Sequence, residues 1–223
     1  MRAAALCLAL AAGPVAAQED YIATHGRLTD EEFYRLVACG APPGGECDMP
    51  FVRWPREAAR ALPIALAPPP PGYSPALAAD LEGALSRAIA EINSAGAAIR
   101  LVRAEAKGLP PAITVTPLNY GNGERIAGSG IPDLEGSTMG AAFVYIWWDG
   151  RHRITEGRIL MADDLPQDEV YPVLLEELTQ SLGFMIDIRN PAYERDSVFS
   201  EDSNSVTRLG AQDRAALRRH YPR

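Results

Sequence analysis

Residues 174–184 read LLEELTQSLGF, and the fold expected for the second half of the chain depends on how this stretch is interpreted. Apolar side chains recur along it at helical spacing: Tyr171, Leu174, Leu175, Leu178 and Leu182. At about 100° per residue these side chains form one stripe, and Glu176 and Gln180 lie almost opposite it, with Glu177 beside them. Gly183 then provides a stop signal. The pattern predicts an amphipathic helix, and taken alone it is that of an ordinary surface helix.

The segment before this helix is predicted to form a β-hairpin. AAFVYIWW at 141–148 is followed by Asp149-Gly150 and then by RHRITEGRILMA at 151–162. An Asp-Gly pair between two β-rich segments favours a tight hairpin turn. Both faces of the first strand are apolar, so we expect the strand either to be buried or to line a cleft. The aromatic side chains expected to share one face are Phe143, Tyr145 and Trp147.

The remaining elements predict a mixed α+β fold. A short buried strand is expected at 63–67. A helix is expected to start at Pro75, because Ser74 can cap a helix that starts with a proline, and to stop within residues 93–96. Two more strands are expected within 98–106 and 112–118. The glycine-rich segment between them and the hairpin is expected to be a mobile loop. With a short C-terminal helix, this order predicts one mixed sheet with an antiparallel edge strand and with helices packed on it.

The first 17 residues have the pattern of a secretory signal peptide. A positive start is followed by an apolar run that is too short to span a bilayer, and then by a small-residue cleavage site. An Ala-rich buried helix is the alternative interpretation. Export to the periplasm or the extracellular space is the prediction that fits position, charge and cleavage pattern together.

Two cysteines remain after the signal peptide. Cys39 and Cys47 flank a Gly/Pro-rich loop, and in an exported chain such a pair predicts one disulfide. We therefore expect a signal peptide at 1–17, an N-terminal segment with the disulfide at 18–62, and the main domain at 63–223.

Composition argues against several classes of function. The formal net charge is −8, Lys107 is the only lysine, and the arginines form no stripe, so a nucleic-acid-binding surface is not expected. No segment after the N-terminal run is long and apolar enough to span a membrane. The glycine-rich segment contains no complete phosphate-binding motif. No cofactor is predicted.

The second half of the chain resembles metzincin-type zinc metallopeptidases. In that family an H-E-x-x-H helix ends at a glycine, a turn with a methionine follows, and a last helix supplies an aspartate and a tyrosine. The residues that match this pattern are Glu177, Gly183, Phe199 in the methionine position, Asp213 and Tyr221. The resemblance implies a zincin-like domain in which the active-site-type helix lies beneath an antiparallel edge strand. The chain resembles an uncharacterised bacterial family of unknown function, distantly related to zincins.

The zinc ligands of a zincin are not matched. Glu176 and Gln180 occupy the positions of the two helix histidines, and Ile186 occupies that of the third, with Asp187 next to it. A neutral amide is a poor zinc ligand, and none of the three histidines of the chain lies on this helix. We therefore predict no metal and no zinc-dependent peptidase activity.

Three functions are compatible with these residues. The first is a non-catalytic, pseudo-peptidase module that binds a protein or peptide in its cleft. The second is a hydrolase that uses Glu177 as general base, with Glu176 or Asp187 as its acid partner or as a ligand of a hard cation. The third is a structural envelope protein whose helix face is solvated. For the first, the residues expected to contact the partner are Glu176, Gln180, Asp187, Tyr145 and Trp147.

Overall fold

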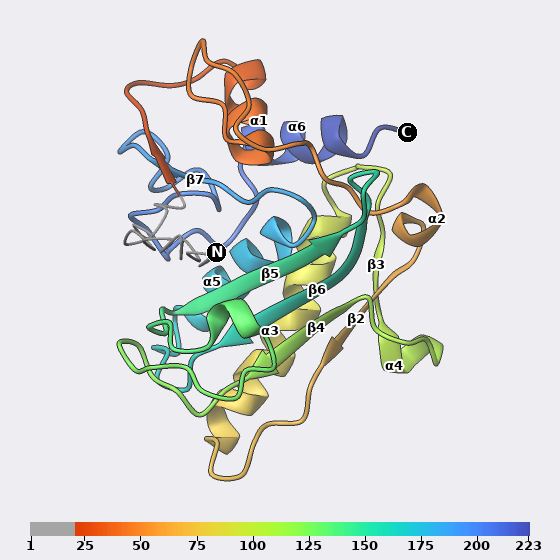
Figure 1. Cartoon of the computed structure of the whole chain (residues 1–223), viewed down its shortest axis with the longest axis vertical. Coiled ribbons are helices and arrows are strands. Elements are labelled where there is room, and N and C mark those ends of the chain that lie inside the picture. The colour runs from red at the N-terminus through yellow and green to blue at the C-terminus, as the bar shows by residue number, and fades with distance from the viewer. Residues whose placement is uncertain (1–20) are drawn as a thin grey trace, which may run out of the picture.

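The computed structural model describes residues 21–223, and the predicted signal peptide lies outside these residues. A five-stranded sheet forms the centre, in the order β3-β2-β4-β6-β5 (Figure 1). Neighbouring strands are parallel except β5 and β6, which are antiparallel and place β5 at one edge. The strands are β2 (Leu62–Leu66), β3 (Leu101–Arg103), β4 (Ile113–Pro117), β5 (Ala142–Trp148) and β6 (Ile154–Met161). The prediction of one mixed sheet with an antiparallel edge strand and with helices packed on it is confirmed.

The β5–β6 hairpin has the predicted strands but a wider turn. Asp149 donates its N–H to the carbonyl of Arg153 at 2.9 Å, and the left-handed residue is His152, with φ 58°, instead of Gly150. The Asp149 carboxylate accepts the N–H groups of Arg151 and Arg153 at 2.8 and 3.1 Å. These bonds hold three residues in the turn, where the Asp-Gly pair had predicted two.

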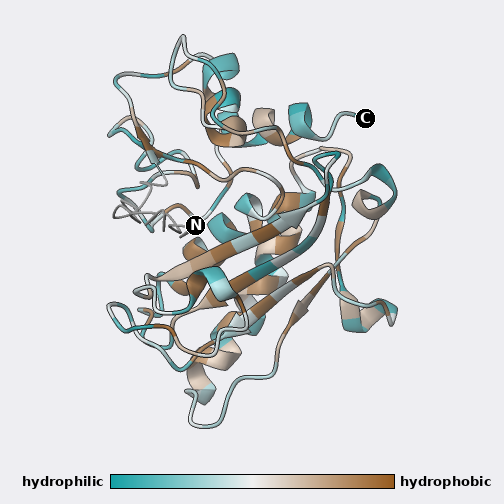
Figure 2. Cartoon of the chain, in the orientation of Figure 1, coloured by the Kyte–Doolittle hydropathy of each residue, from teal (hydrophilic) through white to brown (hydrophobic). Residues whose placement is uncertain are grey.

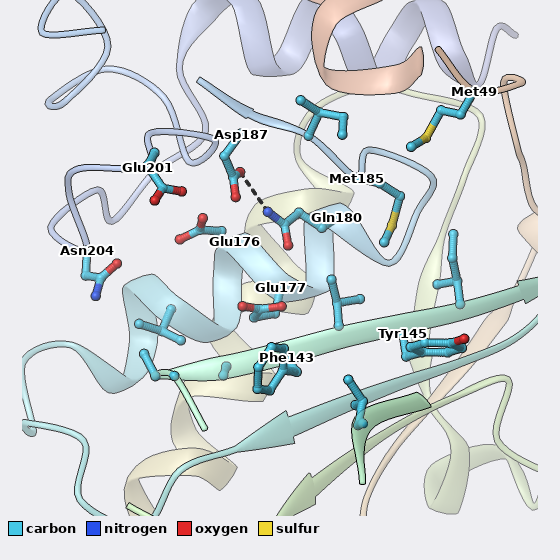
Figure 3. A pocket seen from close by; sticks show the side chains of 18 of the residues that line it. Met49, Phe143, Tyr145, Glu176, Glu177, Gln180, Met185, Asp187, Glu201 and Asn204 are labelled. Atoms are coloured by element: carbon cyan, nitrogen blue, oxygen red, sulfur yellow. Dashed lines mark hydrogen bonds between the residues drawn. The ribbon is translucent and has the colours of Figure 1, made fainter. Parts of the chain in front are cut away.

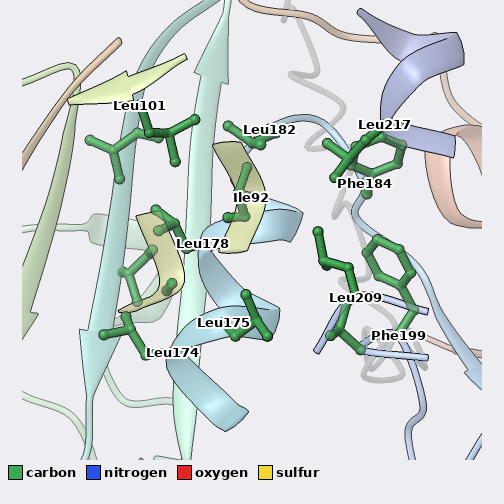
Figure 4. Packing of buried hydrophobic residues seen from close by; sticks show 14 of the residues in the cluster. Ile92, Leu101, Leu174, Leu175, Leu178, Leu182, Phe184, Phe199, Leu209 and Leu217 are labelled. Carbon is green, nitrogen blue, oxygen red and sulfur yellow. The ribbon is translucent and has the colours of Figure 1, made fainter. Parts of the chain in front are cut away.

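Two helices, α3 (Pro75–Asn93) and α5 (Val170–Gln180), lie side by side on one face of the sheet (Figure 1). The predicted apolar stripe of α5 is buried: Leu174 and Leu178 have no exposed surface, and they lie near Ile92 of α3 and Leu101 of β3 (Figure 4). The strands themselves carry many hydrophobic residues (Figure 2). Burial of this interface fixes which face of α5 points away from the core.

The strand predicted within 98–106 ends early. Residues Ala104–Lys107 form a short helix, α4, which ends at Gly108 in the left-handed conformation. Alanine, glutamate and lysine favour helix over strand, which explains the difference. Another short helix, α2 (Arg56–Ala59), precedes β2.

The segment between β4 and β5, predicted as a mobile loop, packs on the sheet. It contains a 3-10 turn, η1 (Pro132–Leu134), and it contributes to a small apolar cluster made of Ile126, Ile131, Met139, Leu160 and Ala162. The aromatic side chains of Phe143, Tyr145 and Trp147 pack against this cluster. The face of the hairpin that points away from α5 is therefore covered.

The N-terminal part joins the same core. Helix α1 (Asp30–Cys39) starts with a capping box between Thr29 and Glu32, and it packs on α6 (Ala211–His220). Cys39 and Cys47 form the predicted disulfide. A two-stranded parallel sheet of β1 (Tyr21–Ala23) and β7 (Asp187–Arg189) was not predicted, because three-residue strands carry no readable alternation. Between residues 21 and 223, no helix has the length and apolar character needed to cross a lipid bilayer.

Candidate functional site

A pocket of about 1010 Å³ lies between the edge strand β5 and helix α5 (Figure 3). One wall is formed by residues 140–148 and the other by α5 and the segment that follows it. The lining residues outside β5 include Met49, Leu134, Val173, Glu176, Glu177, Gln180, Met185, Ile186, Asp187, Glu201 and Asn204. The structure thus brings all six predicted site residues to one pocket: Glu176, Glu177, Gln180 and Asp187, with Tyr145 and Trp147 on β5.

The polar face of α5 is enclosed instead of solvated. Gln180 is only 5 % exposed, and its amide donates a hydrogen bond to the Asp187 carboxylate at 2.8 Å (Figure 3). Glu176 and Glu177 are partly buried in the same pocket. Because β7 follows α5 closely in the chain, its first residue returns to the helix face that carries these side chains.

The turn that follows α5 is held by hydrogen bonds to its carbonyl groups. Trp54 Nε1 donates to the carbonyl of Ser181 at 3.0 Å, and the Tyr221 hydroxyl donates to that of Leu182 at 2.7 Å. The Tyr221 oxygen also accepts the N–H of Trp54 at 3.1 Å. These bonds satisfy carbonyls that a helix end leaves open, and they fix the direction from which α5 enters the pocket.

Glu177 is a partly buried acid with one enclosed carboxylate oxygen. Its Oε2 atom is fully buried and has no hydrogen-bond partner among residues 21–223. Burial raises the pKa of this carboxyl to about 8, and the nearby Asp187 carboxylate adds to the effect. A buried polar atom without a partner is uncommon in folded proteins, and each such case calls for an explanation.

Glu176 is surrounded by other acidic groups. Burial raises the pKa of its carboxyl well above the usual value, and repulsion from Asp187, Glu177, Glu201 and Asp213, in that order, raises it further. No lysine, arginine or histidine occurs among the described residues that line the pocket. Among the residues that the structure describes, Glu176 and Glu177 form no ion pair, whereas Glu201 at the pocket wall pairs with Arg189 at 3.1 Å.

A metal centre is not evident from the described residues. Between positions 21 and 223, no group of three or more histidine, cysteine, aspartate or glutamate residues is arranged to hold an ion. The residues that replace the helix histidines of a zincin, Glu176 and Gln180, both line the pocket, and so does Ile186.

Tyr145 and Trp147 border the pocket through β5, but their rings belong to the other face of the strand. The two ring centroids are 4.7 Å apart, the Tyr145 hydroxyl bonds the Asp133 carboxylate, and the Arg158 guanidinium lies 5.5 Å from the Trp147 ring. Packing occupies these rings, as the alternation of side chains along a strand requires. Both residues nevertheless line the pocket together with Glu176 and Glu177, and their contact with a partner stays a prediction.

The residues matched to the second half of a zincin have clear packing roles. Phe199 is fully buried, with its ring centroid 5.6 Å from that of Phe184. Asp213 accepts hydrogen bonds from Ser197 Oγ at 2.7 Å and from the N–H of Val198 at 3.1 Å, so it holds the turn that precedes Phe199. Burial raises the pKa of Asp213 to about 6.

Sequence reasoning did not find several pocket residues. Met49 comes from the segment after the disulfide loop, Met185 follows α5, and Glu201 and Asn204 follow the Phe199 turn. No local motif marks these positions. For Glu201 alone there was an indirect signal, because it follows residues 197–200, the turn that contains Phe199.

The comparison with known proteins places the chain in a family. Residues 78–223 match the model of a family described as a protein of unknown function, DUF2927. No curated protein shows a significant match. The family match does not extend to zincins, so that relationship stays a prediction. Because the match covers more than half of the sequence, the chain belongs to the DUF2927 family.

Proposed function

We propose that this chain is an exported, non-catalytic binding module that takes an extended peptide segment of a partner protein into the pocket between β5 and α5. The single observation that carries the proposal is the open edge of β5 above this pocket. Within residues 21–223, β5 pairs with β6 alone. An unpaired edge strand presents a row of backbone donors and acceptors, and adding a strand to it is a recurring mode of peptide recognition.

The register defines which backbone groups face the pocket. Ala162 donates its N–H to the carbonyl of Ala141, so the odd-numbered residues of β5 direct their backbone groups toward β6. Val144 and Ile146 therefore direct theirs toward the open side. A peptide of about seven residues would match the length of β5, which spans seven residues.

Export and the absence of zinc chemistry belong to the same proposal. The Cys39–Cys47 disulfide supports an oxidising compartment, either the periplasm or the extracellular space. The scaffold is proposed to be zincin-like because α5 lies beneath an antiparallel edge strand. Zinc hydrolysis needs imidazole or carboxylate ligands and an open position for water. Gln180 and Ile186 stand in two ligand positions and have neither an imidazole nor a carboxylate.

Replacing Val144 by proline tests the proposal. Proline removes the outward N–H, whereas Val144→Ala shortens the side chain and keeps this donor. We expect seven-residue peptides selected from a random library on the wild type to bind Val144→Ala equally and Val144→Pro at least about tenfold more weakly, because one backbone hydrogen bond and the strand alignment are lost. Calorimetry with the purified variants measures the difference.

A second measurement tests strand addition on the wild-type protein, without the Val144→Pro variant. N-methylation of alternate amides in a selected peptide should abolish binding in one register and spare it in the other, since only alternate amides of an added strand face β5. Equal binding of both methylated series, or failure of the wild type to select any peptide, would contradict strand addition.

Hydrolysis with Glu177 as general base is the second candidate, and the raised pKa of Glu177, about 8, favours it. Its weakness is chemical, because no group in the pocket replaces the zinc ion as electrophile. The same peptide screen separates the two functions: mass spectrometry would detect cleaved peptides only for the hydrolase. The enclosure of Glu176, Glu177 and Gln180 in the pocket leaves a purely structural envelope role with less support.

A further inference from the structure

We propose that the pocket recognises a cationic side chain, lysine or arginine, which the bound peptide inserts between β5 and α5 to pair with Glu177 and Glu176. This inference rests on the proposed peptide-binding function and names the chemistry of the partner. It stands on the position of the two carboxyl groups, on the missing partner of Glu177 and on the composition of the pocket wall.

The first argument is that Glu176 and Glu177 lack the ion pairs that other acidic side chains of the chain form. Twenty arginines are spread over the sequence, and ion pairs join Arg103 to Glu82 and Arg214 to Glu91; at the pocket wall, Arg189 pairs with Glu201. In the part of the chain that the structure describes, no ion pair includes Glu176 or Glu177. Within residues 21–223, Glu176 and Glu177 are therefore adjacent carboxyl groups without a basic partner, although the chain contains many arginines.

The second argument concerns the buried Oε2 atom of Glu177. This atom is closed to solvent and has no hydrogen-bond partner among residues 21–223. The Glu177 side chain as a whole is only partly buried and lines the pocket, so a cation in the pocket would lie beside this carboxyl group and offset its charge. An ammonium or guanidinium group provides several donors and a full positive charge, and charge-assisted bonds of this kind are about twice as strong as neutral ones.

The third argument is the shape and polarity of the pocket. Met49, Met185 and Ile186 form an apolar part of the pocket lining. Figure 3 shows Met185 next to Gln180, with Met49 beyond it. Lysine and arginine have an apolar stem and a charged head, so the stem would contact these side chains while the head reaches α5. Methionine side chains adapt to ligands of different shape, which suits either basic residue.

Binding of a cation should depend on pH, because the carboxyl groups must lose protons to pair with it. Asp187 on β7 and Glu201 after β7, which pairs with Arg189, line the same pocket, and Asp213 on α6 adds to the repulsion on Glu176. The only ionisable side chain of β5 is Tyr145, whose hydroxyl bonds Asp133. We therefore expect affinity for the cation to rise from about pH 5 to about pH 8, with release of protons on binding.

A matched pair of small probes tests the inference. Nα-acetyl-arginine amide carries the charge, and Nα-acetyl-citrulline amide has nearly the same shape without it. We expect the arginine probe to bind the wild type at least about tenfold more tightly at about pH 8, followed by nuclear magnetic resonance titration of the α5 amide signals. Glu177→Gln should lower the affinity for the arginine probe at least about tenfold, while Glu156→Gln on the exposed part of β6 should leave it unchanged.

The outcomes separate this inference from the proposed function. Preference for arginine at the α5 signals supports the inference even if no seven-residue peptide binds, in which case strand addition alone is wrong. Selected peptides that bind through β5 but contain no enriched lysine or arginine, together with equal binding of the two probes, would overturn the inference and leave strand addition standing. An arginine preference that survives Glu177→Gln would also overturn it.

Discussion

Replacing Gly183 by alanine is expected to destabilise the protein by more than about 4 kcal/mol, enough to prevent stable folding of an ordinary domain. Gly183 has φ 105°, a conformation that side chains with a Cβ rarely adopt. An added Cβ would penetrate the carbonyl oxygen of Val52 and lie 2.9 Å from His220 Nε2. Both neighbours are fixed, because the His220 ring bonds the same Val52 oxygen at 2.9 Å in the buried core.

Gly136→Ala is the matched control. Gly136 also has a positive φ, 81°, but no atom lies within 4 Å of an added Cβ. It reports the conformational cost alone, which we expect to be about 1 kcal/mol. Urea unfolding followed by circular dichroism compares the two variants with the wild type. A Gly183→Ala variant as stable as Gly136→Ala would show that the Val52 segment moves away, and that α5 is not held as tightly as its hydrogen bonds indicate.

This glycine illustrates what the sequence can and cannot predict. Its position after a run of helical apolar residues correctly predicts the end of α5. The close approach of Val52 and His220 does not follow from any local pattern, because these residues come from opposite ends of the chain. Packing requires a glycine at position 183. A comparison with the zincin motif does not reveal this requirement.

The same limit applies to the rest of the fold and site. The stripe of α5 and the apolar alternation in β5 are local patterns, so the helix and the edge strand were predictable. The helical stripe also identifies the face that carries Glu176, Glu177 and Gln180. It does not determine whether solvent or protein covers that face. The covering is supplied by β5 and by distant segments that contribute Met49 and Glu201, and contacts of such long sequence separation leave no local signature.

Replacing Glu177 by glutamine is expected to make the protein more stable at about pH 8. The Glu177 carboxyl has a pKa of about 8 in the folded protein and an ordinary value near 4.5 in an unfolded chain. Between these values the folded state holds a proton that the unfolded state has released, so the free energy of unfolding falls as pH rises through this window. Glutamine carries no such proton. We expect a gain on the order of 3 kcal/mol, or roughly 6–12 °C in Tm, at about pH 8.

The pH dependence distinguishes this effect from a simple packing change. At about pH 5 the wild-type carboxyl is protonated in the folded state and close in shape to the amide, so the two proteins should differ by less than about 1 kcal/mol. Glu156→Gln, which alters an exposed carboxylate paired with Arg158, should show no such difference between the two pH values. Thermal unfolding of all three proteins at both pH values measures the slopes.

Increased stability of Glu177→Gln would indicate that the Glu177 carboxyl serves a function other than folding. A side chain that destabilises the folded state at neutral pH, and that makes no hydrogen bond through its buried oxygen, contributes nothing to folding that glutamine could not. Such costs are typical of residues that serve binding or catalysis. The same substitution should therefore raise Tm and weaken binding of the arginine probe. If wild type and variant show identical Tm values at both pH values, the Glu177 carboxyl has an ordinary pKa in the folded protein, and the pocket lacks the enclosed charge on which cation recognition depends.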